Sequence, residues 1–398
     1  MAAIEIKPGI YWVGVNDHTT DLFEGLWPVT REGVSYNAYL INDDKKVLID
    51  LAKDLKVEDL LDQIAQVTDP AGLDYIVVHH VEPDHSGALR LLHKLAPNAT
   101  ILASAKALEM INAFYQITDR VRAVADGETI SLGSHTLQFY STPFVHWPET
   151  MMSVETTQKV LFSCDGFGSY GALQGGIFDD DYADLSFYER EALRYYVNIV
   201  ALFSRPVLKA IGRLKEVPVE MIAPSHGLVW RKNPGRILEL FRKWAEYAAG
   251  PVEQGVTLLF GTMYGNTEQM ASAVAQGVAR AGVPVEVFDV RRVHPSYILP
   301  ALYTRSGVLV AAPTYEGGLF PSMAEMLHYA EQKHIHQRKA AYFGSRGWGG
   351  GAQRDFTRLA EQLKWNVSEC WEFDGGPTPE LLQQGEEFGF RFARSLQA

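Results

Sequence analysis

Short apolar runs separated by polar loops recur along the chain and predict strands that alternate with helices. Such runs occupy residues 75–78, 137–140, 160–162 and 221–223. Their lengths suit buried strands, and the segment 86–92 after the first of them has the composition of a helix. Strands and helices that alternate in this way are typical of an α/β fold.

Apolar residues at helical spacing precede the point where we expect the chain to divide. They are Ile237, Leu238, Phe241 and Trp244. Gly250 and Pro251 end this helix, and the apolar run 256–259 begins a new sheet. With 398 residues and 47% hydrophobic content, the chain can bury two cores. We therefore predict two domains, residues 1–250 and 251–398.

Metal-capable side chains gather at the ends of the strands of the first domain. Directly after the run 75–78 come His80, Glu82, Asp84 and His85. Three others each follow a further apolar run: His146, Asp165 and His226. A lone histidine at a strand end usually only caps or bonds locally. A cluster of carboxylates and imidazoles is costly unless a cation organises it, so the pattern predicts a metal site on a strand-to-helix loop.

The number and type of these side chains indicate more than one metal ion. Seven candidate ligands exceed what one tetrahedral zinc needs, so we expect two metals that share a carboxylate, with Asp165 as the bridge. A site rich in oxygen and without thiolate suits iron or manganese at least as well as zinc. Cys164 precedes Asp165 but is expected to point to the opposite face of its strand, as a core residue.

In residues and spacing, this set resembles the diiron domain of flavodiiron proteins, which have the metallo-β-lactamase fold. Hydrolases of that fold carry a histidine where this chain has Glu82, and a carboxylate there favours redox-active iron over zinc. The resemblance implies that His80, Glu82 and His146 hold one iron, that Asp84, His85 and His226 hold the other, and that Asp165 bridges them. The residues alone indicate the set but not this partition.

A second motif, at 260–267, lies between the run 256–259 and an expected helix. Its hydroxyl and amide side chains, with backbone amides at the helix start, can bind a phosphate without a cation. No lysine follows Gly265, so this is not a Walker A loop, and a monophosphate is favoured. The loop resembles the flavodoxin phosphate loop, with Tyr264 in place of the usual threonine.

Two further loops, 313–318 and 345–350, also follow apolar strands and combine glycine with an aromatic residue. Glycine allows close approach to a flat ring, and Tyr315 or Trp348 could stack on it, so FMN is the expected flavin at the switch point of a doubly wound, flavodoxin-like sheet. The predicted cofactor-binding residues are Thr262, Met263, Tyr264, Gly265, Asn266, Thr267, Pro313, Thr314, Tyr315, Gly317, Gly318, Ser345, Arg346, Gly347, Trp348 and Gly349.

Composition narrows the possible partners. A formal net charge of -12 argues against nonspecific binding to nucleic acid or an anionic membrane. With only two cysteines there is neither a disulfide scaffold nor a built-in rubredoxin domain, so the electron donor must be a separate protein. No apolar stretch is long enough to span a membrane, and we expect a cytoplasmic protein.

The resemblance implies an enzyme that reduces nitric oxide to N2O, dioxygen to water, or both, with electrons that pass from a rubredoxin-like donor through FMN to two irons. It also implies a head-to-tail homodimer. One alternative is a zinc-dependent hydrolase of the metallo-β-lactamase fold with an accessory flavodoxin-like domain. Another is an electron carrier with structural metals. Nearby aromatics are expected to belong mainly to the core: Phe23, Trp27, Tyr195 and Tyr196.

Overall fold

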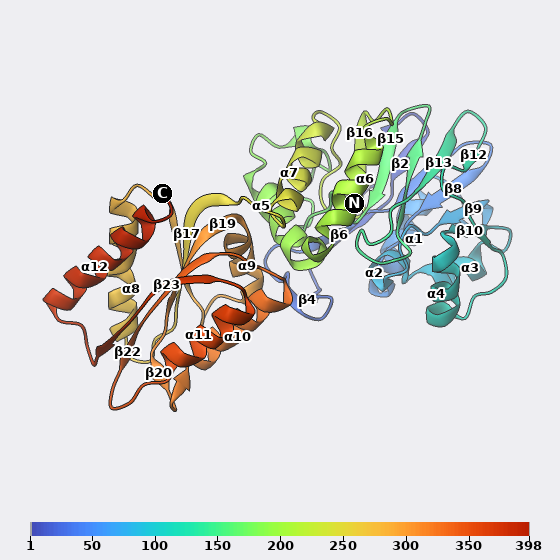
Figure 1. Cartoon of the computed structure of the whole chain (residues 1–398). Coiled ribbons are helices and arrows are strands. Elements are labelled where there is room, and N and C mark those ends of the chain that lie inside the picture. Colours follow the sequence, from blue (N-terminus) through green and yellow to red (C-terminus); the bar gives the residue numbers. More distant parts are fainter. Residues whose placement is uncertain (1, 398) are drawn as a thin grey trace. The chain divides into compact units, whose positions relative to one another are not determined.

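The computed structural model describes residues 2–397, which form two compact units that divide between Ala245 and Glu246 (Figure 1). The connection runs from the end of α7 (Pro234–Glu246) to the start of β17 (Glu253–Phe260). Within residues 2–397, no helix combines the length and the apolar character that a membrane span requires.

The first unit is built on two sheets. The larger sheet has the order β1 (Ile4–Lys7), β2 (Ile10–Trp12), β7 (Tyr39–Asn42), β8 (Lys46–Ile49), β9 (Tyr75–Val77), β10 (Thr100–Ala103) and β11 (Val121–Ala123). The other has the order β12 (Thr129–Ser131), β13 (Thr136–Ser141), β14 (Met151–Glu155), β15 (Val160–Cys164) and β16 (Met221–Pro224). Smaller ladders pair β3 (Val15–Asp17) with β6 (Val34–Tyr36) and β4 (Leu22–Phe23) with β5 (Trp27–Pro28).

A core of large side chains separates the two sheets. Tyr39 of β7 packs on Phe162 of β15, with ring centroids 5.1 Å apart, and both residues are buried. Helices cover the outer faces (Figure 1): α1 (Val57–Ala65), α3 (Leu89–Leu95), α4 (Ala105–Tyr115), α5 (Ser186–Tyr195), α6 (Ser204–Leu214) and α7. The short α2 (Pro83–Ser86) instead follows the carboxyl end of β9. In α7, the buried residues Ile237, Phe241 and Trp244 recur at helical spacing, which fixes the face that packs inward.

Strand direction brings distant parts of the first unit to one edge. β15 and β16 are parallel, with Val160 opposite Met221 and Phe162 opposite Ala223. Their carboxyl ends therefore lie side by side, although some 60 residues separate them in sequence. The segments that follow them carry Asp165 and His226, so the topology itself places these two side chains together.

The second unit is a parallel sheet with helices on both faces. Its strand order is β18 (Val285–Asp289), β17, β19 (Arg305–Ala311), β22 (Lys339–Arg346) and β23 (Asn366–Asp374). In Figure 1, α8 and α12 cover one face and α9, α10 and α11 the other. These helices are α8 (Asn266–Arg280), α9 (Pro295–Thr304), α10 (Pro321–Gln332), α11 (Ala352–Gln362) and α12 (Pro379–Arg394). The order reverses at β17, so a switch point lies at the carboxyl ends of β17 and β19.

Glycines allow α8 and α12 to pack backbone against backbone. A Cβ added at Gly277 of α8 would overlap the Glu386 carbonyl group of α12. In turn, a Cβ at Gly389 of α12 would overlap the Val274 carbonyl of α8. Both contacts require the absence of a side chain, which explains glycine inside two helices where it otherwise costs stability.

Candidate metal centre and cofactor cleft

The structure brings all seven candidate metal ligands together in the first unit. They come from the loop after β9 (His80, Glu82), from α2 (Asp84, His85), from the loop after β13 (His146) and from the segments after β15 and β16 (Asp165, His226). All are buried except Glu82 and Asp84, whose side chains are slightly exposed. A rigid sheet edge therefore aims side chains from four separate segments of the chain at one region.

The sequence prediction that all of 80–85 is a loop is wrong for Asp84 and His85. These residues lie on α2, which begins at Pro83 rather than near Ser86. Proline suits the first position of a helix, because its fixed φ is already helical and the missing N–H would have no helical partner. The His85 N–H donates to the Glu82 carbonyl oxygen, which closes the first turn.

The donor atoms form two groups, and Asp165 belongs to both. In the first group, Nε2 of His80 and Nε2 of His146 lie 3.1 and 3.2 Å from Oε2 of Glu82. The same nitrogens lie 3.5 and 3.4 Å from Oδ2 of Asp165. These atoms surround a space that a single metal ion could fill.

The second group surrounds the other oxygen of Asp165. Nε2 of His85 and Nε2 of His226 lie 3.0 and 3.4 Å from Oδ1 of Asp165. The Asp84 carboxylate completes the group, because its Oδ2 lies 3.2 Å from Nε2 of His226. Each oxygen of Asp165 thus faces one group, which is the geometry of a bridging carboxylate.

Several of these buried donor atoms have no hydrogen-bond partner within the described residues. They are both carboxylate oxygens of Asp84, Nε2 of His85, Oδ2 of Asp165 and Nε2 of His226. They lie near one another without making well-aligned hydrogen bonds. Donor atoms take this arrangement when their lone pairs point to a common metal ion. Buried polar atoms without partners are costly, so the donor set fits a pair of metal ions.

Hydrogen bonds to the ring nitrogens that face away from the site orient two of the candidate histidine ligands. Nδ1 of His80 lies 2.6 Å from Oε1 of Glu149, and Nδ1 of His226 lies 2.6 Å from the Ser35 carbonyl oxygen. Each contact favours the tautomer with Nε2 free to bind a metal. The hydroxyl of Tyr195 donates to Oδ1 of Asp165 at 2.7 Å, so this carboxylate is held from the protein side as well.

Cys164 differs from its prediction in direction. It is buried, as expected for a core residue, but its Sγ lies 4.0 Å from Nδ1 of His85 instead of on the opposite side of the strand. The reason is local: Cys164 has a φ of 53°, so the backbone leaves the extended conformation that the alternation rule assumes. The thiol therefore lies behind the second group.

The electrostatics of the site favour positive charge beside its carboxylates. Burial alone would lower the pKa of His146, but Asp165 and Glu82 raise it to about 10. Burial likewise opposes a charged His226, yet Asp165 and Asp84 raise its pKa to about 9. For Asp165, burial favours the neutral acid, but His85 and other imidazoles hold its pKa well below its usual range. The same buried carboxylates would stabilise the positive charge of a metal cation.

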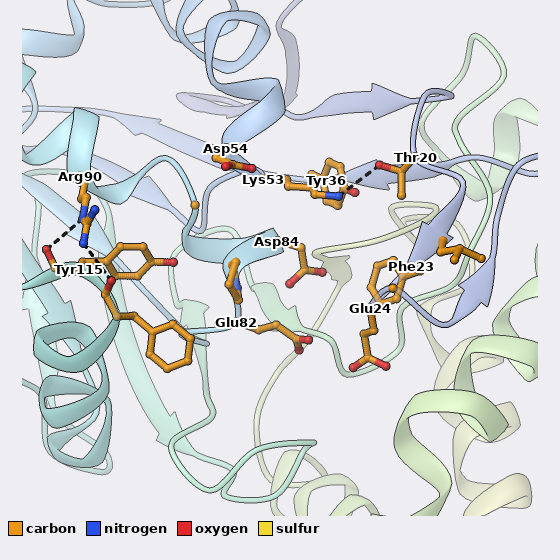
Figure 2. Close-up of a pocket in the computed structure, with 15 residues that line it drawn as sticks. Thr20, Phe23, Glu24, Tyr36, Lys53, Asp54, Glu82, Asp84, Arg90 and Tyr115 are labelled. Carbon is orange, nitrogen blue, oxygen red and sulfur yellow. Dashed lines mark hydrogen bonds between the residues drawn. The ribbon is translucent and has the colours of Figure 1, made fainter. Parts of the chain in front are cut away.

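A cavity of about 620 Å³ opens onto both groups (Figure 2). In Figure 2, the carboxylates of Glu24, Glu82 and Asp84 point into this cavity. Burial and the charge of Glu82 raise the pKa of Glu24 to about 7. Lys53, Asp54 and Arg90 also line it, together with four aromatic side chains: Phe23, Tyr36, Phe114 and Tyr115. Phe23 is thus a wall residue rather than core alone, whereas Trp27 and Tyr196 do not line the cavity.

A second cavity, of about 670 Å³, lies at the switch point of the second unit. Its lining residues are Met263, Tyr264, Asn266, Pro313, Thr314, Tyr315, Glu316, Gly317, Ser345, Arg346, Gly347, Trp348, Gly349, Gly350 and Gly375. The three loops that the sequence singled out therefore meet at one cleft. Glu316, Gly350 and Gly375 were not predicted, and Gly375 follows β23, for which the sequence analysis proposed no loop.

Four predicted cofactor residues do not line this cleft: Thr262, Gly265, Thr267 and Gly318. Thr262 braces the loop, because its Oγ1 accepts the Gly265 N–H at 3.0 Å. Gly265 has a φ of 93°, which allows the sharp turn into α8. Thr267 lies in the first turn of α8 with a buried Oγ1 that has no partner in the described chain. An unpaired hydroxyl at a helix N-terminus fits a phosphate group.

Comparisons with known proteins agree with both units. Residues 34–227 match a family described as ODP family beta lactamase, and residues 258–389 match flavodoxin. A nitric oxide reductase of Moorella thermoacetica is 34% identical over 96% of this chain and 95% of its own length. The chain belongs to the flavodiiron protein family.

Solved structures extend the agreement to the whole fold of this flavodiiron protein. The rubredoxin oxygen:oxidoreductase of Desulfovibrio gigas superposes with a TM-score of 0.92 at 30% identity and covers 99% of this chain and 98% of its own. The flavodiiron protein from Giardia intestinalis gives a TM-score of 0.92 at 29% identity, with coverage of 100% and 97%. The predicted fold class, a metallo-β-lactamase-like domain followed by a flavodoxin-like domain, is confirmed.

Sequence reasoning missed three residues that this flavodiiron protein places at its metal centre. Glu149 was not singled out, although an acidic residue close to His146 in the sequence is a usable signal. Tyr195 was assigned to the core, because nothing in its local pattern distinguishes it from other buried aromatics. Glu24 lies at a turn between two short strands and had no signal, because its approach to Glu82 depends on the tertiary fold.

Proposed function

We propose that this protein is an oxidoreductase that reduces nitric oxide to N2O, dioxygen to water, or both, with a diiron centre and FMN as cofactors. One observation carries the proposal: seven donors converge in two groups that share the two oxygens of Asp165, in the same chain as a cleft suited to a flavin monophosphate. The names of the Moorella and Desulfovibrio relatives support the two substrates.

The ligands divide between two irons in this proposal. His80, Glu82 and His146 would hold one, Asp84, His85 and His226 would hold the other, and Asp165 would be shared between them, which the two donor groups support. The loops at 262–267, 313–318 and 345–349 would hold FMN, and the first turn of α8 would receive its phosphate. When bound, two ferrous ions and reduced FMN supply four electrons, enough to reduce one O2 to two waters or four NO to two N2O.

The protein's own groups bind the substrate and fix the geometry. The aromatic part of the cavity wall offers an apolar surface to a small uncharged diatomic molecule, and Glu82 and Asp84 connect the cavity to the two donor groups. Glu149 keeps Nε2 of His80 directed at the first group. The Tyr195 hydroxyl removes electron density from one Asp165 oxygen, which tunes how strongly that oxygen binds a metal.

A rubredoxin-type carrier is proposed as the electron donor, supported by the name of the Desulfovibrio relative and by the lack of cysteine pairs in this sequence. We also propose a head-to-tail homodimer, in which the flavin cleft of one subunit serves the metal centre of the other. Two aromatic side chains at the cleft, Tyr264 and Trp348, are 91% and 103% exposed, as expected of surfaces that a partner covers. A cytoplasmic location stays a prediction from the sequence.

The test of the proposed function is the product made by the reduced protein. Iron- and FMN-loaded protein, fully reduced and mixed anaerobically with NO, is expected to release N2O, and O2 consumption is measured in parallel. Metal analysis of protein purified from cells grown with both metals separates the alternatives. Two zinc ions, no iron and hydrolytic activity would replace this proposal with the hydrolase.

Chemically reduced holoprotein that consumes neither NO nor O2 would leave the electron carrier as the better assignment. An Asp165→Asn variant is the matched negative control, because it keeps the volume of the side chain but removes the bridging charge. It should lose both activities while the flavin remains bound.

A further inference from the structure

A third cleft lies in the first unit and shares no lining residue with the two cavities described above. Its volume is about 550 Å³, and one wall consists of Asp126 and of residues 141–144, which run from the end of β13 into the loop towards β14. The other wall is one face of α6, which contributes Arg205, Lys209 and Arg213. A pocket of this size can accommodate a ligand of mononucleotide size.

The face of α6 carries more positive charge than the structure neutralises. Arg205, Lys209 and Arg213 are spaced by four residues, so they lie on the same face. Arg213 is committed to structure, because it donates two hydrogen bonds of 2.9 Å to Asp126. Arg205 and Lys209 are exposed and have no carboxylate within ion-pair distance among residues 2–397. In a chain of net charge -12, two unpaired cations in one cleft favour an anionic ligand.

The opposite wall offers groups suited to a nucleoside. Phe144 is 45% exposed, and its ring stacks at 6.0 Å and 21° on Phe203, so one ring supports the other. Thr142 is 95% buried, and its Oγ1 has no hydrogen-bond partner within the described chain. An exposed aromatic face can stack on a base, and a buried unpaired hydroxyl requires a polar ligand group.

The loop that carries these groups is held rigidly. The Phe144 N–H donates to the Trp147 carbonyl at 2.6 Å, and the Val145 N–H donates to the Thr142 carbonyl at 3.2 Å. Phe144 has a φ of 63°, a conformation that a bulky side chain seldom adopts without a reason. The surrounding hydrogen bonds, rather than the intrinsic conformational preference of the Phe144 backbone, therefore hold the exposed ring in place.

We propose that this cleft binds a nucleoside phosphate, with the base on Phe144, the phosphates on Arg205 and Lys209, and a polar group of the ligand on Thr142. The two unpaired cations provide one positive charge for each phosphate group of a diphosphate, and arginine recognises phosphate oxygens in its planar fork. The binding does not depend on turnover, so it stands or falls separately from the proposed function.

Isothermal titration of the iron- and FMN-loaded protein with ADP tests the proposal. Saturation with FMN keeps ADP out of the flavin cleft. We expect one ADP per chain, with adenosine alone and pyrophosphate alone each binding at least about tenfold more weakly, since each lacks one half of the contacts. Pyrophosphate that binds as tightly as ADP would overturn the nucleoside assignment.

Variants locate the binding. Removing both unpaired charges with Arg205→Gln and Lys209→Gln should weaken ADP binding about tenfold or more, and Phe144→Leu and Thr142→Val should each weaken it severalfold. Lys215→Gln, which removes a charge just past the end of α6, is the matched control and should change it less than about twofold. Circular dichroism and iron and flavin content should match the parent. ADP binding that is absent, or unchanged in the double variant, would overturn the proposal.

Discussion

At the residue scale, hydrogen bonds behind the candidate metal ligands fix the orientation of their side chains. Tyr195 and Tyr196 are adjacent and both buried, yet only Tyr195 reaches a ligand, through its hydrogen bond to Asp165. The hydroxyl of Tyr196 instead lies 2.8 Å from Oγ of Ser204. Replacing either tyrosine by phenylalanine therefore removes the same hydroxyl group at neighbouring positions, and the two variants can be compared.

Tyr195→Phe is expected to lower turnover with NO or O2 by about tenfold, in the range found when outer contacts of a metal ligand are removed. Without the hydroxyl, Asp165 becomes a stronger donor, which stabilises the ferric state and should lower the midpoint potential of the diiron centre. Redox titration and steady-state rates measure both effects. Tyr196→Phe is the control. Equal losses in the two variants would show that the effect is structural.

Candidate site residues were predictable where several metal-capable side chains lie close together in the sequence. The segment from His80 to His85 predicts a metal site by itself. The number of candidate donors predicts two metals, with Asp165 as the bridge. What was not predictable depended on backbone conformation or tertiary approach. Cys164 turned towards His85 because of a positive φ, and Glu24 approached Glu82 from a hairpin that is remote in sequence.

At the element scale, the packing of α8 on α12 depends on glycine. Gly277→Ala is expected to lower the free energy of unfolding of the second unit by about 2–3 kcal/mol, because the added methyl group overlaps the Glu386 carbonyl and forces the helices apart. Urea unfolding followed by circular dichroism and flavin release measures the loss.

Gly212 of α6 supplies the opposite case, since a Cβ there meets nothing within 4 Å. Gly212→Ala should therefore stabilise the protein by about 0.5–1 kcal/mol through helix propensity alone. If Gly277→Ala also stabilised the protein, the close approach of α8 and α12 would be wrong.

Asp17, the last residue of β3, carries a buried carboxylate. Burial of Asp17 favours its neutral form, but hydrogen bonds from Thr19 and Thr20 and the charge of Lys56 lower its pKa to about 2. Because the folded pKa lies below the unfolded value of 3.8, the ionised group stabilises the fold above about pH 4 and loses that effect as pH falls towards 2.

Asp17→Asn is thus expected to cost about 2 kcal/mol at pH 7, the scale of hydrogen bonds to a charged group. The difference from the parent should stay constant down to about pH 5 and shrink below pH 4. Thermal unfolding of both proteins between pH 3 and 7 measures it. Thr19→Val, which removes one hydroxyl donor to Asp17, should reproduce part of the loss. A difference that grows on acidification would contradict the assignment.

Secondary-structure elements were predictable where the hydrophobic pattern repeats. Their boundaries and the pairing of strands were less predictable. The runs 75–78 and 160–162 became β9 and β15 with small shifts, because alternation and β-branching decide buried strands locally. The start of α2 was misplaced, since Pro83 can end one segment or begin the next. Sheet order could not come from one sequence, because pairing partners such as β15 and β16 lie far apart in the chain.

At the scale of the whole molecule, the proposal requires electrons to cross between subunits, and mixed dimers can reveal the route. One subunit carries Asp165→Asn, which disables its metal centre. Its partner carries Thr267→Asp, which places a negative charge where the flavin phosphate would bind, at the start of α8. Each homodimer should be inactive. If electrons cross, the mixed dimer keeps one complete pair and should show about half of the parent rate per dimer, measured as NO or O2 consumption.

The reciprocal dimer makes the test decisive. Here a parent subunit is paired with a subunit that carries both substitutions, so the only intact flavin cleft and the only intact metal centre lie in the same chain. Electron transfer across subunits predicts no activity, because each intact site faces a disabled one. Transfer within one subunit predicts the reverse, half activity here and none in the first mixed dimer. Two different tags allow each dimer to be purified, and equal iron and flavin contents ensure that only the arrangement of sites differs.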